Sequence, residues 1–501
     1  MAEEIPVYYF AFAKDSMAAP LQDEGKGTEE PGDVLAQMQK RFKTTVYESQ
    51  KATPSVSSKP ANYLEFQNGP VPILDGRYGT TPNSIALPVE VYHPAFAYFS
   101  ALARDSVREP PDDIIDLTIQ LTATSSRIVT TELSRQSATR DVLSKILRFP
   151  IIQTVNQNKS SADHAVIYSR SGSDPIGAAA LSIFEEKADL GISGDPTTQG
   201  SFSYLQHWTD PGQKALSEAT SCPSFIISIA GPWLVVLGAV LTSSAIVQRL
   251  TDFIWLGNSR VVDDTHTLRL ARIFTALRDA MARLQIFYER FTLPVEPNTR
   301  FFPYATSFVE RNGSSSRTVK FSYKQPLKYW EHPSECVAFL ATTSDGKPVV
   351  VKFVERYGAK AHEKLAEMGK APALLYHGDV WPGDEVASEG CSPRKMVVME
   401  YIDGETCEGG VSDTVRKAVR SAVEYLHSQR IVHGDIRRPN IIIARGEGDE
   451  GSRVKILDFD WAGEEGKARY PLRLSPGLWP DGVGDNKLIS ALHDMAMLER
   501  L

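Results

Sequence analysis

The stretch IVHGDIRRPNIII, residues 431–443, places His433, Asp435 and Asn440 between two apolar runs. The β-branched residues on both sides are typical of buried strands. A polar insert between two buried segments is held rigidly at the edge of a core, where chemically active groups are often found. This stretch therefore predicts a functional loop in the C-terminal part of the chain.

The composition is that of a globular protein. The chain has 501 residues, enough for about two to four domains. Its formal net charge of -8 argues against a generally basic nucleic-acid binder. The four cysteines lie far apart without a CxxC pair, which favours free thiols in a reducing compartment. The acidic N-terminus lacks the features of a signal peptide, so we expect an intracellular protein, cytoplasmic or nuclear.

One apolar segment challenges that expectation. Residues 224–247, SFIISIAGPWLVVLGAVLTSSAIV, carry no charge, and their length would allow them to span a bilayer. Gly231 and Pro232 interrupt the run, and proline breaks a helix more readily than it breaks a hairpin. The segment therefore favours two buried strands over a membrane span, and we expect no membrane partner.

The pattern of the remaining chain indicates several domains. Residues 88–150 show apolar positions at helical spacing, and strands are expected near 164–169 and 178–186. A long amphipathic helix is expected over 263–291. We predict a loosely structured N-terminal region at 1–87, an α/β domain at 88–308, a linker at 309–319 and a second domain at 320–501.

The second domain collects groups suited to phosphate chemistry. Lys352 lies inside an apolar strand, where an unpaired ammonium is costly to bury. Asp435 and Asn440 lie five residues apart, and Asp458 follows Asn440 by 18 residues at the end of another strand. Oxygen donors that converge can hold Mg²⁺ together with phosphate oxygens, while a separate carboxylate orients a hydroxyl. A lysine can neutralise the remaining phosphate charge.

The segments VVVKF, HGDIRRPNI and LDFDWAG, in this order, resemble the protein-kinase-like domains common in fungal proteins. The resemblance implies an α+β bilobal fold at 320–501, ATP and Mg²⁺ as cofactors, and a protein substrate. It implies Asp435 as catalytic base, Lys352 as the ligand of the α- and β-phosphates and His433 as a brace of the loop. The other implied residues are the Mg²⁺ ligands Asn440 and Asp458, the adenine hinge Met399, Glu400, Tyr401 and Ile402, and Glu363 as the helix partner of Lys352.

Several positions depart from this family pattern. No GxGxxG precedes Lys352, and Gly434 replaces an arginine, as in small-molecule kinases. Asp460 stands where a glycine is usual, and Glu367 is the alternative to Glu363 as lysine partner. A Ser/Thr protein kinase is therefore our leading hypothesis, with a small-molecule kinase and an inactive pseudokinase as alternatives.

A second set of polar residues lies in the first domain. Asp163 precedes one expected strand, and FEEK ends the next with Glu185 and Lys187. Two carboxylates can bind Mg²⁺, and a neighbouring lysine can position a water against a phosphodiester. The order of these residues, with Gln199 on the following helix, resembles the PD-(D/E)xK nuclease superfamily, which implies a restriction-endonuclease-like mixed sheet and a nucleic-acid partner. Together with the kinase-like domain, this order resembles Crinkler-type architecture. The alternatives to a kinase are thus a nuclease regulated by a pseudokinase domain, and a non-catalytic scaffold.

Overall fold

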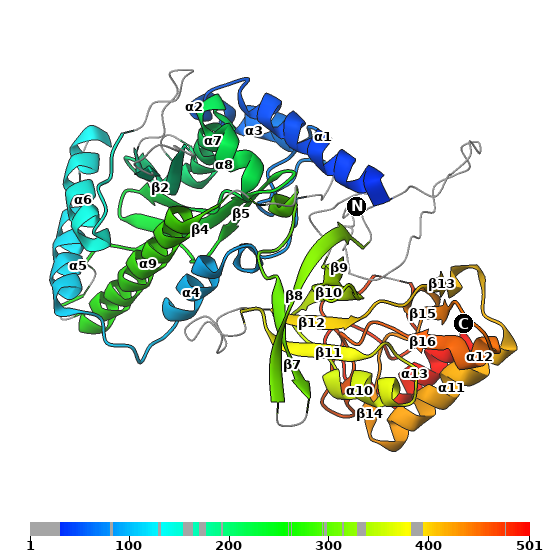
Figure 1. Ribbon diagram of the computed structural model, residues 1–501. Coiled ribbons are helices and arrows are strands. Elements are labelled where there is room, and N and C mark those ends of the chain that lie inside the picture. The colour runs from blue at the N-terminus through cyan, green and yellow to red at the C-terminus, as the bar shows by residue number, and fades with distance from the viewer. Residues whose placement is uncertain are drawn as a thin grey trace.

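A mixed six-stranded sheet forms the centre of the N-terminal half in the computed structural model (Figure 1). The structure describes residues 31–501 except 81–83, 129–131, 154–163, 170–176, 192–193, 259, 262, 293, 295–297, 313–314, 328–336, 382–393 and 476. The sheet has the order β1-β2-β3-β4-β5, with β6 paired to β4. Its strands are β1 (His164–Ser169), β2 (Ala178–Lys187), β3 (Ser224–Ala230), β4 (Trp233–Leu241), β5 (Ala245–Arg249) and β6 (Ile254–Trp255).

The prediction of buried strands in the apolar run 224–247 is confirmed. It forms β3, β4 and the start of β5, and all of β3 is buried. β3 and β4 pair antiparallel around Gly231, which has a φ of 58° in the turn between them. Within the described ranges, none of the helices has the length and apolar character needed to cross a membrane.

Helices cover both faces of this sheet. Phe225 of β3 packs against Phe96 and Phe99 on one face, while the next residue, Ile226, faces Gly200 on the other. This alternation follows from the two-residue period of a strand. β2 and β3 run parallel, joined by a helical crossover. The helices are α4 (Pro94–Leu102), α5 (Asp112–Ser125), α6 (Glu132–Leu147), α7 (Pro196–Thr209), α8 (Lys214–Ala219) and α9 (Asp264–Arg290).

The prediction of a loose region at 1–87 is wrong for its described part. Residues 31–67 form α1 (Pro31–Ser49), α2 (Pro54–Ser57) and α3 (Pro60–Gln67). Met38 and Phe42 are buried one helical turn apart, and the Thr45 hydroxyl donates to the Ser243 carbonyl at 2.9 Å. A small number of apolar residues at helical spacing is therefore enough to pack α1 against the sheet. Because the segment as a whole is polar, its average composition does not indicate this packing.

The prediction of a linker at 309–319 is also wrong. These residues belong to β7 (Ser307–Asn312) and β8 (Ser315–Pro326), which pair as an antiparallel hairpin. The Gly- and Ser-rich segment is a turn between strands, because such residues serve tight turns as well as linkers. β7 and β8 extend a second six-stranded sheet with the order β11-β12-β10-β9-β8-β7.

The C-terminal part has two lobes, as predicted for its α+β fold (Figure 1). The first lobe contains the second sheet and one helix, with β9 (Ala338–Thr343), β10 (Pro348–Val354), α10 (Ala359–Glu367), β11 (Leu374–Asp379) and β12 (Lys395–Glu400). The second is mainly helical, with β13 (Gly404–Thr406), α11 (Asp413–Ser428), β14 (Ile431–Val432), β15 (Ile441–Ala444), α12 (Glu450–Arg453), β16 (Val454–Ile456), β17 (Gly463–Glu464) and α13 (Ala491–Glu499).

The second sheet shares its hydrophobic core with the N-terminal half, not with the second lobe. Phe302 stacks on Tyr323 of β8 with ring centroids 5.3 Å apart. The rings of Tyr304 and Trp381, which lies just after β11, have their centroids 6.0 Å apart. The N-terminal half and the second sheet are therefore packed together around a common core.

Candidate functional site

Lys352 projects from β10 into a pair of carboxylates. Its Nζ lies 2.8 Å from Oδ1 of Asp458 and 2.7 Å from Oδ1 of Asp460. The lysine side chain is 5% exposed, so the ammonium depends on these partners. Burial by itself would lower the pKa of Lys352, but the two carboxylates outweigh it and hold the pKa above its ordinary value.

The two carboxylates differ in their pKa. Lys352 holds the pKa of Asp458 below its ordinary value, although burial opposes that shift. Burial, with the charge of Asp458 added, raises the pKa of Asp460 to about 7. Asp458 is therefore the more acidic member of the pair, and the Lys352 ammonium favours the ionised form of both carboxylates. Asp458 has a φ of 63°, so its side chain leaves the strand end at a sharp bend.

Asp435 lies in the loop after β14 and is almost fully buried. Its carboxylate accepts two N–H groups of Arg437, one of them at 2.9 Å, and the Nδ2 of Asn440 at 2.8 Å. Burial raises the pKa of Asp435, and Arg437 opposes that shift. The loop thus brings Asp435 and Asn440 together, as their five-residue spacing predicts.

Asn440 presents an oxygen that fits a metal ion. Its Oδ1 is buried and, among the described residues, has no hydrogen-bond partner. The backbone N–H of Leu457 donates to the Asn440 backbone carbonyl at 2.8 Å, so the residue before Asp458 is hydrogen-bonded to Asn440. A buried amide oxygen that lacks a hydrogen-bond partner is a suitable ligand for a hard cation such as Mg²⁺.

His433 braces this loop from inside the protein. Its Nδ1 accepts the backbone N–H of Asp435 at 3.2 Å, and its ring lies 5.1 Å from that of Phe459. Burial lowers the pKa of His433, which favours the neutral ring. On the other side, Phe459 stacks on His362 of α10 at 4.5 Å. The sequence analysis did not identify His362, whose place on an amphipathic helix gave no chemical signal.

Asp494 was also missed by the sequence analysis. It is fully buried in α13 and accepts the backbone N–H groups of His433 and Gly434 at 2.8 and 2.7 Å. An aspartate inside the apolar face of a short helix is a weak signal for such a role. Only the fold reveals that this carboxylate holds the backbone of the loop.

The predicted contact between Glu363 and Lys352 is wrong. α10 buries Ala361, His362 and Leu365, so Glu363 points to solvent. Successive side chains of a helix point about 100° apart, so the residue after a buried position can face solvent. The described carboxylates that contact Lys352 are those of Asp458 and Asp460.

The four residues expected to contact adenine follow one another at the connection between the two lobes. Met399 and Glu400 end β12, and Tyr401 and Ile402 lead towards β13. Met399 belongs to a small apolar cluster with Val354 and Val397. The Glu400 backbone N–H donates to the carbonyl of Ala373 at 2.9 Å.

The second predicted set of residues also comes together in part. Lys187 Nζ lies 3.5 Å from Oε1 of Glu185, and Gln199 donates to the same carboxylate. Ser203 of α7, which the sequence analysis did not identify, donates to the other oxygen at 3.1 Å. Asp163 lies outside the described residues. Among the described residues, no three His, Cys, Asp or Glu side chains are grouped to hold a metal ion.

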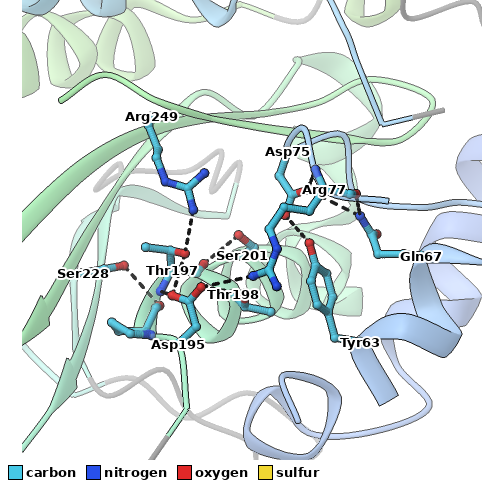
Figure 2. A network of polar contacts seen from close by, with 11 residues as sticks. Tyr63, Gln67, Asp75, Arg77, Asp195, Thr197, Thr198, Ser201, Ser228 and Arg249 are labelled. Carbon is cyan, nitrogen blue, oxygen red and sulfur yellow. Dashed lines mark hydrogen bonds and ion pairs between the residues drawn. The ribbon is translucent and has the colours of Figure 1, made fainter. Parts of the chain in front are cut away.

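A polar network fixes the start of α7 next to this set (Figure 2). Asp195 caps the helix by accepting the backbone N–H of Thr197 at 2.8 Å. Arg77 donates to Asp195 at 3.3 Å through its side chain and to Asp75 at 2.9 Å through its backbone N–H. Tyr63 of α3 donates to Asp75 at 2.5 Å. The helix that carries Gln199 and Ser203 is thereby connected to the N-terminal helices.

Part of the C-terminal half is similar to known protein kinases. Residues 335–471 match the family model described as protein kinase domain. A segment of 78 residues is 37% identical to the serine/threonine-protein kinase PAK 1 of Mus musculus, and it covers 14% of this chain and 13% of the relative. The match includes Lys352, Asp435, Asn440 and Asp458 within the limits of the family model. Residues 335–471 of this chain therefore belong to a protein kinase domain.

Proposed function

We propose that this protein is an ATP-dependent phosphotransferase, most simply a Ser/Thr protein kinase. The proposal rests on one observation, the convergence of Lys352, Asp435, Asn440 and Asp458 within a protein kinase domain. These residues come from three separate segments of the chain, namely β10, the loop after β14 and the segment after β16, so their meeting depends on the fold of both lobes. The name of the mouse relative supports a serine or threonine hydroxyl as acceptor.

The roles of the nucleotide-binding residues follow from their contacts. Lys352 supplies a buried cation for the phosphates, and Met399 offers an apolar surface for adenine beside the lobe connection. Asn440 Oδ1 and the Asp458 carboxylate are the oxygens that would hold Mg²⁺. The ion would neutralise negative charge on the phosphate oxygens during transfer.

Asp435 orients the acceptor and takes its proton. The hydroxyl donates its proton to the Asp435 carboxylate as its oxygen forms a bond to the γ-phosphorus, and the bond to the β-phosphate oxygen breaks to leave ADP. A cavity of about 410 Å³ next to the loop, lined in part by Ile436, Arg437 and Trp479, offers room for an acceptor. Oδ1 of Asp435 accepts one N–H of Arg437, so a lone pair of this oxygen remains for the hydroxyl proton.

Mg²⁺-dependent ATP binding and turnover test this proposal. The purified chain is compared with Asp435→Asn, Asp458→Ala and, as a matched control, Asp413→Asn at the exposed start of α11. We expect the first two substitutions to abolish turnover and the control to retain it. Binding without turnover in the unaltered chain would instead indicate a pseudokinase. A chain that does not bind ATP at all would contradict the proposal and favour a non-catalytic scaffold.

The contact between Glu185 and Lys187 supports a second candidate, a metal-dependent nuclease. β2 carries both residues on one face, and α7 adds Gln199 to the same carboxylate. Cleavage of single- and double-stranded DNA in the presence of Mg²⁺ or Mn²⁺ tests it with Asp163→Ala and Glu185→Gln. Cleavage lost in both variants while ATP binding is retained would support this candidate. An unaltered chain without cleavage would contradict it.

A further inference from the structure

Lys352 has a partner that the family pattern does not provide. In protein kinases the lysine of this strand pairs with a glutamate of the following helix, and the position of that helix controls activity. Here the corresponding helix, α10, presents His362 to the interior and Glu363 to solvent. Asp460 instead reaches Lys352 Nζ at 2.7 Å. We infer that Asp460 is the positioning residue that holds Lys352 for nucleotide binding, in place of a carboxylate from α10.

This inference rests on the proposed phosphotransferase function and follows from the charges around Lys352. Asp458 is the carboxylate suited to Mg²⁺, and a carboxylate that turns towards a metal ion is no longer available to neutralise the lysine. Among the described residues, Asp460 is then the carboxylate that still contacts the Lys352 ammonium. An ammonium has three N–H donors, so Lys352 can keep Asp460 and still donate to phosphate oxygens.

The backbone around Asp460 is fixed firmly enough for this role. The N–H of Gly358, which precedes α10, donates to the carbonyl of Phe459 at 2.8 Å, and the N–H of Ala462 donates to the same carbonyl at 3.2 Å. A Cβ at Gly358 would lie 2.6 Å from the Ala462 carbonyl oxygen, so the two segments touch through their backbones. The stack of His362 on Phe459 adds a side-chain contact to this junction.

The arrangement has a consequence for regulation. In this chain one short loop supplies both the metal ligand Asp458 and the lysine partner Asp460. Lys352 is therefore positioned whenever that loop is folded, and no carboxylate on α10 has to swing inwards. Control by movement of a helix glutamate, which governs many protein kinases, is absent from this mechanism.

Binding of Mg²⁺-ATP, measured by calorimetry, tests the inference in the full chain. Asp460→Asn keeps the size of the side chain and removes its charge, and Asp460→Glu is the conservative variant. Glu363→Gln examines the rival partner on α10. We expect Asp460→Asn to weaken binding at least about tenfold, since it removes one partner of a buried ion pair. Asp460→Glu should recover part of that loss, and Glu363→Gln should bind as the unaltered chain does.

A double-mutant cycle separates positioning from a general loss of structure. In a Lys352→Met background, Asp460→Asn should cause no further loss of ATP binding, because the residue through which it acts is already gone. Additive losses in the two variants, or a loss in Glu363→Gln equal to that in Asp460→Asn, would overturn the inference. If the unaltered chain binds and turns over ATP while Asp460→Asn does the same, the inference fails and the proposed function stands. If the unaltered chain binds no ATP, both fail.

Discussion

The carboxylate of Asp494 accepts the backbone N–H of His433 at 2.8 Å, although 61 residues separate the two positions. The same carboxylate accepts the N–H of Gly434 at 2.7 Å and contacts His427 at 3.0 Å. One buried side chain thus connects α13, the end of α11 and the loop that leads to Asp435. The geometry of the loop at 433–440 therefore depends on a residue far from it in the sequence.

Asp494→Asn should weaken both folding and turnover. An asparagine has one acceptor oxygen, and its NH₂ group would face a backbone N–H, so a buried donor is left unpaired. We expect the free energy of unfolding to fall by about 2–3 kcal/mol. Chemical denaturation measures this change, and ATP turnover under native conditions measures the effect on the loop. An effect no larger than that of Asp413→Asn on the exposed start of α11 would contradict this role.

Arg300 is a structural cation of the N-terminal half. Its guanidinium donates to the carbonyls of Ser217, Leu241 and Thr242 and lies 3.6 Å from the ring centre of Phe42. Burial lowers its pKa to about 10, so the group remains charged at neutral pH.

Arg300→Met should lower the free energy of unfolding by about 3 kcal/mol or more, because buried carbonyls lose a charged donor. Urea denaturation measures the loss. Arg317→Met serves as the matched control, since the Arg317 side chain is 62% exposed and forms a surface ion pair with Glu310. Equal effects of the two substitutions would show that Arg300 does not carry this role.

His93 makes the stability of the N-terminal half depend on pH. It is buried between Phe287 and Tyr304, and burial lowers its pKa to about 3 from an ordinary value of 6.5. The unfolded chain therefore takes up a proton near pH 6.5 while the folded chain does not. The stability that the neutral ring contributes is complete above pH 6.5 and is lost as the pH falls towards 3.

His93→Asn removes this titration and keeps an acceptor for the Ala95 N–H, which His93 Nδ1 accepts at 3.2 Å. Between pH 6.5 and 4 the unaltered chain should lose up to about 1.4 kcal/mol per pH unit through this group. The variant should show a shallower dependence in denaturation experiments at several pH values. Burial also lowers the pKa of His207 to about 4, so a smaller slope remains in the variant. Identical slopes would refute the assignment to His93.

The shared core predicts where the chain can be divided. A fragment that begins at residue 320 would expose Tyr323 and Trp381, which pack against Phe302 and Tyr304 in the full chain. We expect such a fragment to aggregate or to unfold at a lower temperature than the full chain, because its first lobe loses part of its core. Thermal unfolding and size-exclusion chromatography test this expectation. A monomeric fragment with an unchanged melting temperature would contradict it.

The sequence predicted the local elements well because their signals are local. The uncharged run at 224–247, the helix at 264–290 and the strand around Lys352 all follow from apolar spacing within a few turns or residues. The order of Lys352, Asp435, Asn440 and Asp458 predicted a protein-kinase-like domain, and residues 335–471 match the family model of that domain. The prediction of a linker at 309–319 was wrong because a hairpin turn and a linker have the same Gly- and Ser-rich composition.

By itself, therefore, the sequence determined which groups are present, on which elements they lie and in which order they follow. The tertiary structure alone decided which of them meet. It turned Glu363 to solvent and His362 inwards, placed the Asp460 carboxylate 2.7 Å from Lys352 Nζ, and placed the Asp494 carboxylate against the backbone of residues 433 and 434. It also joined the N-terminal half to the first lobe through one core. The physical reason is that burial and ion pairing depend on distances across the fold, whereas periodicity and spacing describe neighbours along the chain.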